Sequence, residues 1–482
     1  MRIRSFKRAL GSGGAPLAIL LIFLALTALG GGSSRAGVPS LLFLRPAAII
    51  CVVGLLLFSP RFELSPLRPP LLLLGAFAGI IALQLIPLPP EIWQALPGHA
   101  RFIQAAALEG VKQPWRPISL QPDLTESSLL ALTTPLVILL GFAALPRSQR
   151  PALVTTLVII IAVSAFWGIL QITSAGSGAR LYRLSNVGEP LGLFANRNHQ
   201  AALLAAGFPI LRLWLYLGPK IDAVEPSDRT IAYLRIFITI ALSLILLPTI
   251  VLTGSRTGLL LGVMGLGGAL LIAPTRLPIA RGRNRWAVRA ALLIVPMMLL
   301  VAMILFGRAV ALDRLFASDL VGGEQRVIFA PITFAIALAF LPFGSGFGTF
   351  DSVFRIYEPD SVLKPSYFNH AHNDLVELLL TGGLPAVALL LGLALWMLAR
   401  VRSVFRRPER SRKPERAAAR AGMIVIAILF VASITDYPLR TPLLAGVFAL
   451  MICWIAADHS DDRILKSAAS REGRLYDHEP VD

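Results

Sequence analysis

Long apolar runs, separated by short polar breaks, occupy most of this sequence. A membrane-crossing helix needs about 20 consecutive, mostly apolar residues, and each run approaches or exceeds that length. The pattern therefore predicts an all-α, polytopic integral membrane protein with about 12 transmembrane helices. The runs lie near 15–30, 40–59, 70–87, 127–145, 151–173, 198–217, 230–252, 257–273, 288–307, 383–400, 421–436 and 440–457.

Composition supports this class and excludes a water-soluble one. Of the 482 residues, 56% are hydrophobic and 15% are charged, and the mean hydropathy is +0.72. Soluble domains carry roughly a quarter charged residues. The net charge of +18 could suggest nucleic acid, but no RNA-binding or zinc-binding signature accompanies the basic residues. We expect the lipid bilayer, and no nucleic acid, as a partner.

The positions of Lys and Arg predict the orientation in the membrane. Loop 274–289 contains five Arg and no acidic residue, and loop 400–420 contains nine basic residues against two acidic ones. Short loops this basic remain in the cytoplasm. Alternation from these two loops places both termini in the cytoplasm. Segment 308–370, with five basic and six acidic residues, becomes a large periplasmic loop.

Segment 327–343 is apolar enough to resemble a further crossing, but it is short and contains Pro331. Both flanking basic loops must be cytoplasmic, so an even number of helices lies between them. The runs at 288–307 and 383–400 already make two. We therefore expect 327–343 to lie at the outer membrane surface or to re-enter from it.

These features divide the chain into four parts. We expect N-terminal transmembrane helices over 1–189, with a periplasmic loop at 88–126, and a core over 190–400 that includes periplasmic loop 308–370. The third part, 401–457, combines the cytoplasmic basic loop with the last two transmembrane helices, and 458–482 is a cytoplasmic tail.

Polar clusters interrupt the apolar pattern on the predicted periplasmic face. Arginine presents a planar fork of donors that fits phosphate and keeps its charge, and histidine is the commonest general base. Together they suggest an anionic substrate beside a proton acceptor. The clusters are segment 253–258 with Ser255 and Arg256, then Arg326, then segment 369–374 with His372 and Asn373.

Each of these residues also has a structural explanation. Arg256 could extend from a helix end to the membrane interface, and Arg326 could be an ordinary loop charge. His372 could pack at a helix start, because Asn373 and the acidic residues after it are typical of a helix N-terminus. His370 and His372 also raise metal binding. No further ligand set at suitable spacing accompanies them, so we expect no metal and no other cofactor.

Two further segments carry a specific signal. Arg197 and Asn198 lie at the periplasmic entry to the sixth run, and Arg183 upstream gives this loop a basic excess that suits an anionic donor. Segment 344–348 is Gly-Ser-Gly-Phe-Gly. It follows no strand and opens no βαβ unit, so we interpret it as a tight turn or a close backbone approach rather than a nucleotide site.

Taken in order, these segments resemble the O-antigen ligases and the related O-antigen polymerases. His372-Asn373, nine residues and Gly383 match the family's histidine signature, which continues with two residues and then Gly, Thr or Tyr. That last position is Ala386 here, a departure to another small residue.

Three other elements carry the same resemblance, which covers residues 190–400. Ser-Arg-x-Gly at 255–258 resembles the family's arginine motif. Arg326, followed by segment 344–350, resembles the stretch before its histidine, and segment 196–198 fits an upstream Asn-x-Asn element.

The resemblance implies glycan transfer from a polyprenyl (undecaprenyl) diphosphate carrier to a hydroxyl acceptor at the periplasmic face of a bacterial inner (cytoplasmic) membrane. The reaction is expected to be metal-independent and to invert the anomeric carbon. Arg256 and Arg326 would hold the diphosphate, and His372 would position or deprotonate the acceptor. Asn373 and Ser255 would contact substrate, as would Arg183, Arg197 and Asn198 if they bind the donor.

Alternatives remain within and outside this family. A ligase attaches finished polymer to lipid A-core, an O-antigen or exopolysaccharide polymerase extends the growing lipid-linked glycan, and another relative glycosylates proteins. The histidine signature favours a ligase. A polysaccharide-lipid transporter or flippase is the main competitor from another class. Ion-coupled transporters usually carry acidic residues in the membrane, whereas 127–188 and 229–312 contain no Asp or Glu.

Overall fold

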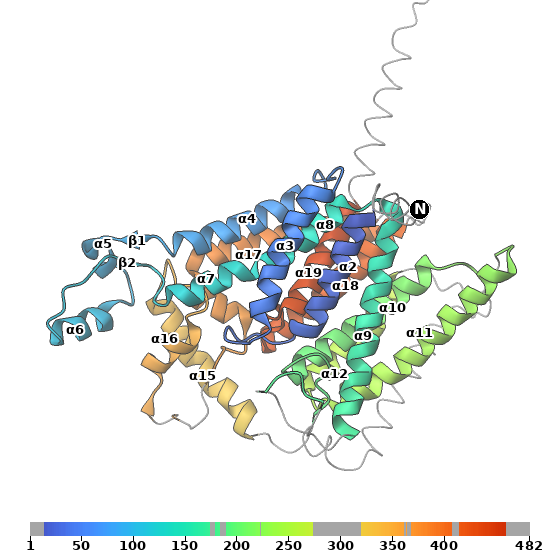
Figure 1. Cartoon of the computed structure of the whole chain (residues 1–482). Helices are drawn as coiled ribbons and strands as arrows, with labels where there is room; N and C mark the ends of the chain where they lie inside the picture. The colour runs from blue at the N-terminus through green and yellow to red at the C-terminus, as the bar shows by residue number, and fades with distance from the viewer. Residues whose placement is uncertain are drawn as a thin grey trace, which may run out of the picture.

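The computed structural model describes residues 14–173, 179–183, 189–221, 223–272, 320–360, 363, 368–406 and 414–458, without the side chains of 320–328. These residues are almost entirely α-helical (Figure 1). Every predicted apolar run within the described residues contains a helix, and run 288–307 lies outside them. The all-α prediction is therefore confirmed for the described part of the chain.

Seven of the described helices are long and apolar enough to cross a membrane. They are α3 (Leu41–Phe58), the pair α7 (Pro122–Ala131) and α8 (Thr133–Ala144), α9 (Arg150–Thr173), α10 (Arg197–Leu217), α11 (Pro226–Leu252), α17 (Asp374–Arg406) and α18 (Pro414–Thr435). Shorter apolar helices are α2 (Gly14–Gly30), α4 (Arg68–Leu83), α12 (Arg256–Ile272) and α19 (Pro442–Ala457). These helices indicate a multi-pass membrane protein. The total of about twelve crossings stays a prediction.

The tenth predicted run, 383–400, belongs to a much longer helix. α17 begins at Asp374 and ends at Arg406, with a kink at Gly383, where φ is 61° and ψ is −158°. A Cβ at Gly383 would lie 2.2 Å from the carbonyl oxygen of Pro342, so only glycine fits this approach. The turn before α17 therefore sits at the end of a helix that extends through the bundle.

The glycine-rich segment 344–348 makes the close backbone approach that its sequence predicts. Gly344, Gly346 and Gly348 all have positive φ. A Cβ at Gly344 would lie 2.6 Å from the carbonyl oxygen of Thr381, and one at Gly346 would lie 2.5 Å from the hydroxyl of Ser119. This segment therefore locks α17 against the chain that precedes α7.

Helices α10 and α12 pack at close range through small residues. A Cβ added at Gly265 of α12 would lie 2.2 Å from the carbonyl oxygen of Ala205 in α10. One added at Gly258 would lie 2.6 Å from the Cβ of Ala201. Small residues let membrane helices approach backbone to backbone. This contact brings the starts of α10 and α12 to the same end of the bundle.

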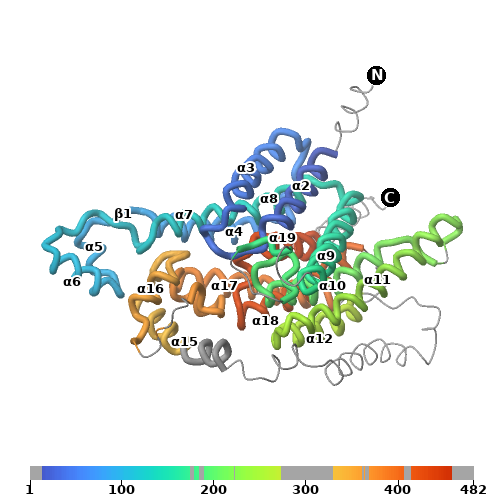
Figure 2. Tube along the Cα trace, turned by 60° about the horizontal axis from the view of Figure 1, so that its bottom comes forward, coloured from blue at the N-terminus to red at the C-terminus, as the bar shows by residue number. Residues whose placement is uncertain are grey.

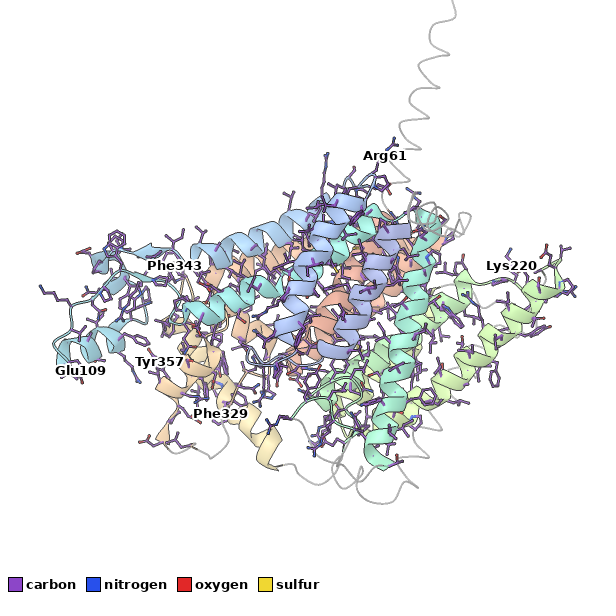
Figure 3. The ribbon with its side chains drawn as sticks, in the orientation of Figure 1. Arg61, Glu109, Lys220, Phe329, Phe343 and Tyr357 are labelled. Atoms are coloured by element: carbon purple, nitrogen blue, oxygen red, sulfur yellow. The ribbon has the colours of Figure 1, made fainter. Side chains whose placement is uncertain are left out.

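The contacts of α2 and α19 identify the two ends of the bundle. α2 ends and α19 begins at one end, where the amide of Leu443 donates to the carbonyl of Gly31 at 3.0 Å; we call this the lower end, toward the bottom of Figure 1. At the other end Arg416, from the basic segment, lies 3.8 Å from Asp458. Arg61 lies at that upper end as well (Figure 3). The start of α2 and the end of α19 thus share the upper end, and its cytoplasmic location stays a prediction.

Residues 87–117 form a side lobe that projects from the bundle in both views (Figures 1 and 2). Strand β1 (Pro87–Leu88) pairs antiparallel with β2 (Arg116–Pro117), with α5 (Pro90–Gln94) and α6 (Ala100–Leu108) between them. The lobe covers most of the loop predicted at 88–126. The last residues of that predicted loop belong to α7. Arg101 donates to the carbonyl of Ile356 at 2.7 Å and joins the lobe to α16 (Phe350–Tyr357).

Segment 327–343 forms most of helix α15 (Leu320–Ala339), which continues into the turn before α16. Phe329 of α15 packs on Phe354 of α16 with ring centroids 5.3 Å apart. The same hydrophobic cluster includes Leu380 of α17. The segment is therefore a packed helix beside the start of α17, and its depth in the membrane stays a prediction.

The close approach of α10 and α12 predicts a difference between two neighbouring glycines. We expect Gly265→Ala to destabilise the protein by about 1–3 kcal/mol, because the methyl group would overlap the Ala205 carbonyl. Gly267→Ala is the matched control, since its Cβ would meet nothing within 4 Å. Thermal unfolding of the purified protein in detergent checks the difference, and equal midpoints would contradict the tight contact.

Candidate functional site at the lower end of the bundle

The turn before α17 is fixed by its own side chains. Asn373 Oδ1 accepts hydrogen bonds from the amides of Leu375 at 3.0 Å and Val376 at 3.2 Å. Such caps satisfy the free amides of a first helical turn. Asn373 thus has the structural role that a helix start predicts, and its contact with substrate stays a prediction.

His372 occupies a left-handed backbone conformation, with φ of 50°. Its Nδ1 lies 2.9 Å from the carbonyl oxygen of His370, and its ring stacks on Phe368 with centroids 4.8 Å apart. A carbonyl oxygen only accepts hydrogen bonds, so Nδ1 carries the proton and Nε2 the lone pair in the neutral ring. This tautomer suits a proton acceptor at Nε2.

A cluster of carboxylates and one guanidinium lies beside this turn. Arg440, in the α18–α19 turn, has Nε 2.9 Å from Asp374 Oδ1 and Nη1 3.1 Å from Glu377 Oε1. Burial alone would lower the pKa of Arg440, but the carboxylates of Glu377 and Asp374 outweigh it and raise that pKa. Arg440 therefore stays charged and ties the last turn of the chain to the start of α17.

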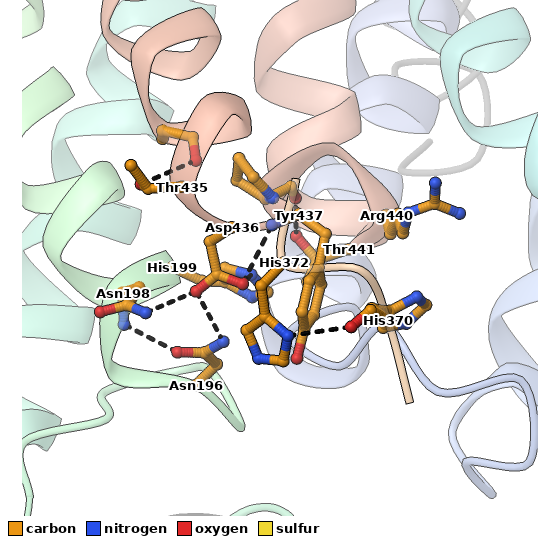
Figure 4. Close-up of polar contacts among 12 residues, drawn as sticks. Asn196, Asn198, His199, His370, His372, Thr435, Asp436, Tyr437, Arg440 and Thr441 are labelled. Carbon is orange, nitrogen blue, oxygen red and sulfur yellow. Dashed lines mark hydrogen bonds and ion pairs between the residues drawn. The ribbon is translucent and has the colours of Figure 1, made fainter. Parts of the chain in front are cut away.

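A second polar cluster centres on Asp436, which is 2% exposed. Its Oδ2 accepts hydrogen bonds from the side-chain amides of Asn196, at 3.1 Å, and Asn198. Its Oδ1 accepts from the backbone amide of Tyr437 at 3.0 Å. Figure 4 shows these residues around the ring of His372. The carboxylate thus joins the start of α10 to the turn between α18 and α19.

Tyr437 separates the two imidazoles of the turn before α17. Its ring centroid lies 4.2 Å from that of His370 and 5.1 Å from that of His372. Burial, with a further contribution from Asp436, raises the pKa of Tyr437. The phenol therefore remains neutral, and its ring packs at 44° to that of His370 and at 76° to that of His372.

The predicted arginine motif comes to the same end of the bundle. Ser255 is the cap of α12, and its Oγ accepts from the amide of Gly258 at 2.9 Å. Arg256 begins α12 with an exposed side chain. Because Gly258 packs on Ala201 of α10, Arg256 begins its helix beside the start of α10.

Three of the other predicted residues lie at this end of the bundle. Arg197 pairs with the buried Glu189 at 2.6 Å. Asn198 contacts Asp436, as described above, and Arg183 lines the cavity described below. Arg326 lies in α15, but its side chain is outside the described residues.

A cavity of about 1900 Å³ opens beside the turn before α17. At its lower end the lining includes Arg45, Arg183, His370 and Arg440, and farther along it is mostly apolar as far as Phe405. Beyond the kink at Gly383, the apolar lining follows α17 from Ala386 to Phe405, about 28 Å at 1.5 Å per residue, close to the roughly 30 Å of a bilayer's hydrocarbon core. The cavity therefore suits an amphiphile with a long apolar tail.

Sequence reasoning missed Asp436, Arg440 and the role of Glu377. The first two lie in a polar break between the last two apolar runs, which is the only signal that could have indicated them. Among the described residues, no group of three or more His, Cys, Asp or Glu side chains could hold a metal ion.

Fold and site together define a multi-pass membrane protein with a polar centre at one end of its bundle, beside a long apolar cavity. Residues 241–391 match the model of the O-antigen ligase family, so over this stretch the chain is similar to that family. The family implies a glycosyl-transfer enzyme. The matched stretch includes Ser255, Arg256, Arg326, His372 and Asn373. No curated protein sequence matches the chain.

The contacts of Asp436 predict a stability effect. In Asp436→Asn, an amide donor replaces one oxygen and faces either the two asparagine amides or the amide of Tyr437. A buried donor without an acceptor costs about 1–3 kcal/mol, so we expect a lower unfolding midpoint in purified protein. Glu109→Gln makes the same chemical change on the exposed side lobe and should leave the midpoint unchanged. A similar loss in both variants would contradict the assigned contacts.

Proposed function

We propose that this protein transfers a glycan from a polyprenyl (undecaprenyl) diphosphate carrier to a hydroxyl of lipid A-core, as an O-antigen ligase. The reaction is placed at the periplasmic face of a bacterial inner membrane, with both chain termini in the cytoplasm. One observation carries the proposal. At one end of the bundle, the turn that contains the family's histidine lies beside an apolar cavity of about bilayer length.

The cavity supports a lipid-linked donor over a small soluble one. Pockets for drug-sized ligands occupy roughly 300–1,000 Å³, whereas this cavity has about 1900 Å³. Its apolar length would take the polyprenyl tail, and its basic lower end would take the diphosphate. Arg183 is in that lining. We assign it, with Arg197 and Asn198 at the start of α10, to donor binding.

The reaction requires charge compensation as the diphosphate leaves. Arg256 and Arg326 are assigned this role, because guanidinium groups stabilise phosphate oxygens with paired donors. Ser255 and Asn373 hold the starts of α12 and α17 near the substrate. His372 acts on the acceptor hydroxyl, which attacks the anomeric carbon as the bond to the diphosphate breaks, with inversion and without metal.

The histidine assignment predicts a severe defect in His372→Ala. General-base help is worth about 10²–10⁴-fold and correct placement of the acceptor on the order of 10²-fold, so in either role at most a trace of glycan transfer should remain. The measurement is the lipid-linked glycan pool in cells that lack this protein, with wild type or His372→Ala added back. Long polymer stranded on the carrier supports a ligase, and stranded single repeat units would instead support a polymerase.

Two outcomes of this experiment would contradict the proposal. Full rescue by His372→Ala would remove the histidine from the reaction. A solute flux by the purified protein in liposomes, without any glycan transfer, would favour the transporter or flippase.

The arginine assignment predicts that charge alone is not sufficient at position 256. Arg256→Lys keeps the positive charge but loses the planar fork of donors, so we expect at least a tenfold loss of transfer, about the value of one charge-assisted hydrogen bond. Transfer is measured in cells that lack this protein and carry the added variant, as the amount of glycan that stays on the lipid carrier. Arg229→Lys, on the exposed start of α11, is the matched control. Wild-type transfer by Arg256→Lys would show that a point charge suffices.

A further inference from the structure

The two histidines of the turn before α17 have different surroundings. His370 is among the residues that line the cavity, as are Asp374 and Arg440, and its side chain is 14% exposed. His372 is not among the lining residues, and its Nδ1 is engaged with the carbonyl of His370. The imidazole at the cavity wall is therefore that of His370.

A buried carboxylate orients this imidazole. Glu377 is 1% exposed, and its Oε1 lies 3.0 Å from Nδ1 of His370. Its Oε2 accepts the amide of Ala371 at 2.9 Å, and Arg440 supplies the balancing charge. An ionised carboxylate only accepts hydrogen bonds, so Nδ1–H donates and Nε2 carries the lone pair. A base oriented by a third group is the usual arrangement for activating a hydroxyl.

The charged and titratable groups around His370 come from three elements, one of which is α10 with the buried His199. The start of α17 contributes Glu377 and Asp374, and the α18–α19 turn contributes Arg440 and Tyr437. Arg45, in α3, and Arg183 line the same cavity. The carboxylate of Glu377 accepts from Nδ1–H of His370, so it fixes the orientation of the imidazole and leaves Nε2 as the acceptor atom.

We propose that His370 is the proton acceptor of the reaction, with Glu377 and Arg440 as positioning residues, and that His372 positions the acceptor. This inference rests on the proposed glycan transfer. The acceptor hydroxyl gives its proton to Nε2 of His370, and its oxygen forms the new bond to the anomeric carbon. The bond from that carbon to the diphosphate breaks, and the diphosphate leaves with the electron pair.

The test uses the full chain in nanodiscs and chemical rescue. A lipid extract of cells that lack this protein supplies donor and acceptor, and released polyprenyl diphosphate is the readout. His370→Ala leaves a gap beside Glu377, so we expect transfer to fall at least about 100-fold and to recover in part with added imidazole. His372→Ala should fall as well, without recovery. His99→Gln, in the side lobe, is the control for loss of an imidazole and should transfer normally.

A second variant separates proton transfer from a structural role. In Glu377→Gln the anionic acceptor that orients Nδ1–H of His370 is lost, so kcat should drop while KM for the donor stays unchanged. Binding of polyprenyl diphosphate, followed by native mass spectrometry, should be unchanged. Glu109→Gln is the matched control.

The outcomes are distinguishable. Imidazole rescue of His372→Ala alone, or near wild-type transfer by His370→Ala, overturns the assignment of His370 and leaves glycan transfer standing. If imidazole rescues both variants or neither, the kcat of Glu377→Gln decides, and an unchanged kcat overturns the assignment. No transfer by the wild-type chain would overturn the proposed function itself.

Discussion

The guanidinium of Arg440 is the contact on which the geometry of the site depends. It compensates two carboxylates at the start of α17 that would otherwise be buried close together. Removing one partner of such a buried pair leaves an uncompensated charge, which typically costs about 3–5 kcal/mol. The left-handed conformation of His372 is strained for a residue with a side chain. Glu377, held by Arg440, fixes the backbone at Ala371 beside it and helps keep that conformation in place.

The membrane explains why the site is built from helix starts and turns. Inside a bilayer each backbone polar group needs an internal partner, so irregular chain is confined to the ends of the helices or to protein-lined cavities. α10, α12 and α17 all begin at the lower end, each with a polar side chain at its start: Asn196, Ser255 and Asn373. Helix starts carry partial positive charge, which complements the anionic donor that we propose.

Much of the fold could be predicted from the sequence, because apolar length is a local property. Most runs within the described residues predicted a helix to within a few residues, but α18 begins at 414 rather than 421. The run at 383–400 underestimated α17, since Asp374 and Glu377 are polar in sequence. Their charges are compensated by Arg440, more than 60 residues away, and no local pattern contains that information. The motifs likewise indicated His372 and Arg256, but not that Asp436 holds the two asparagines 240 and 238 positions away.

The stretch that matches the family contains the motif residues but not the contacts that position them. Asp436 and Arg440 follow residue 391, and Asn196 and Asn198 precede residue 241. The cavity wall also includes residues from α3, α4 and α8, far outside that stretch. Residues 241–391 alone would therefore lack the carboxylate that joins α10 to the last turn and the guanidinium that holds the start of α17. The chemistry indicated by the motif needs the whole bundle, because the motif histidines lie on a turn whose conformation is fixed from outside the matched stretch.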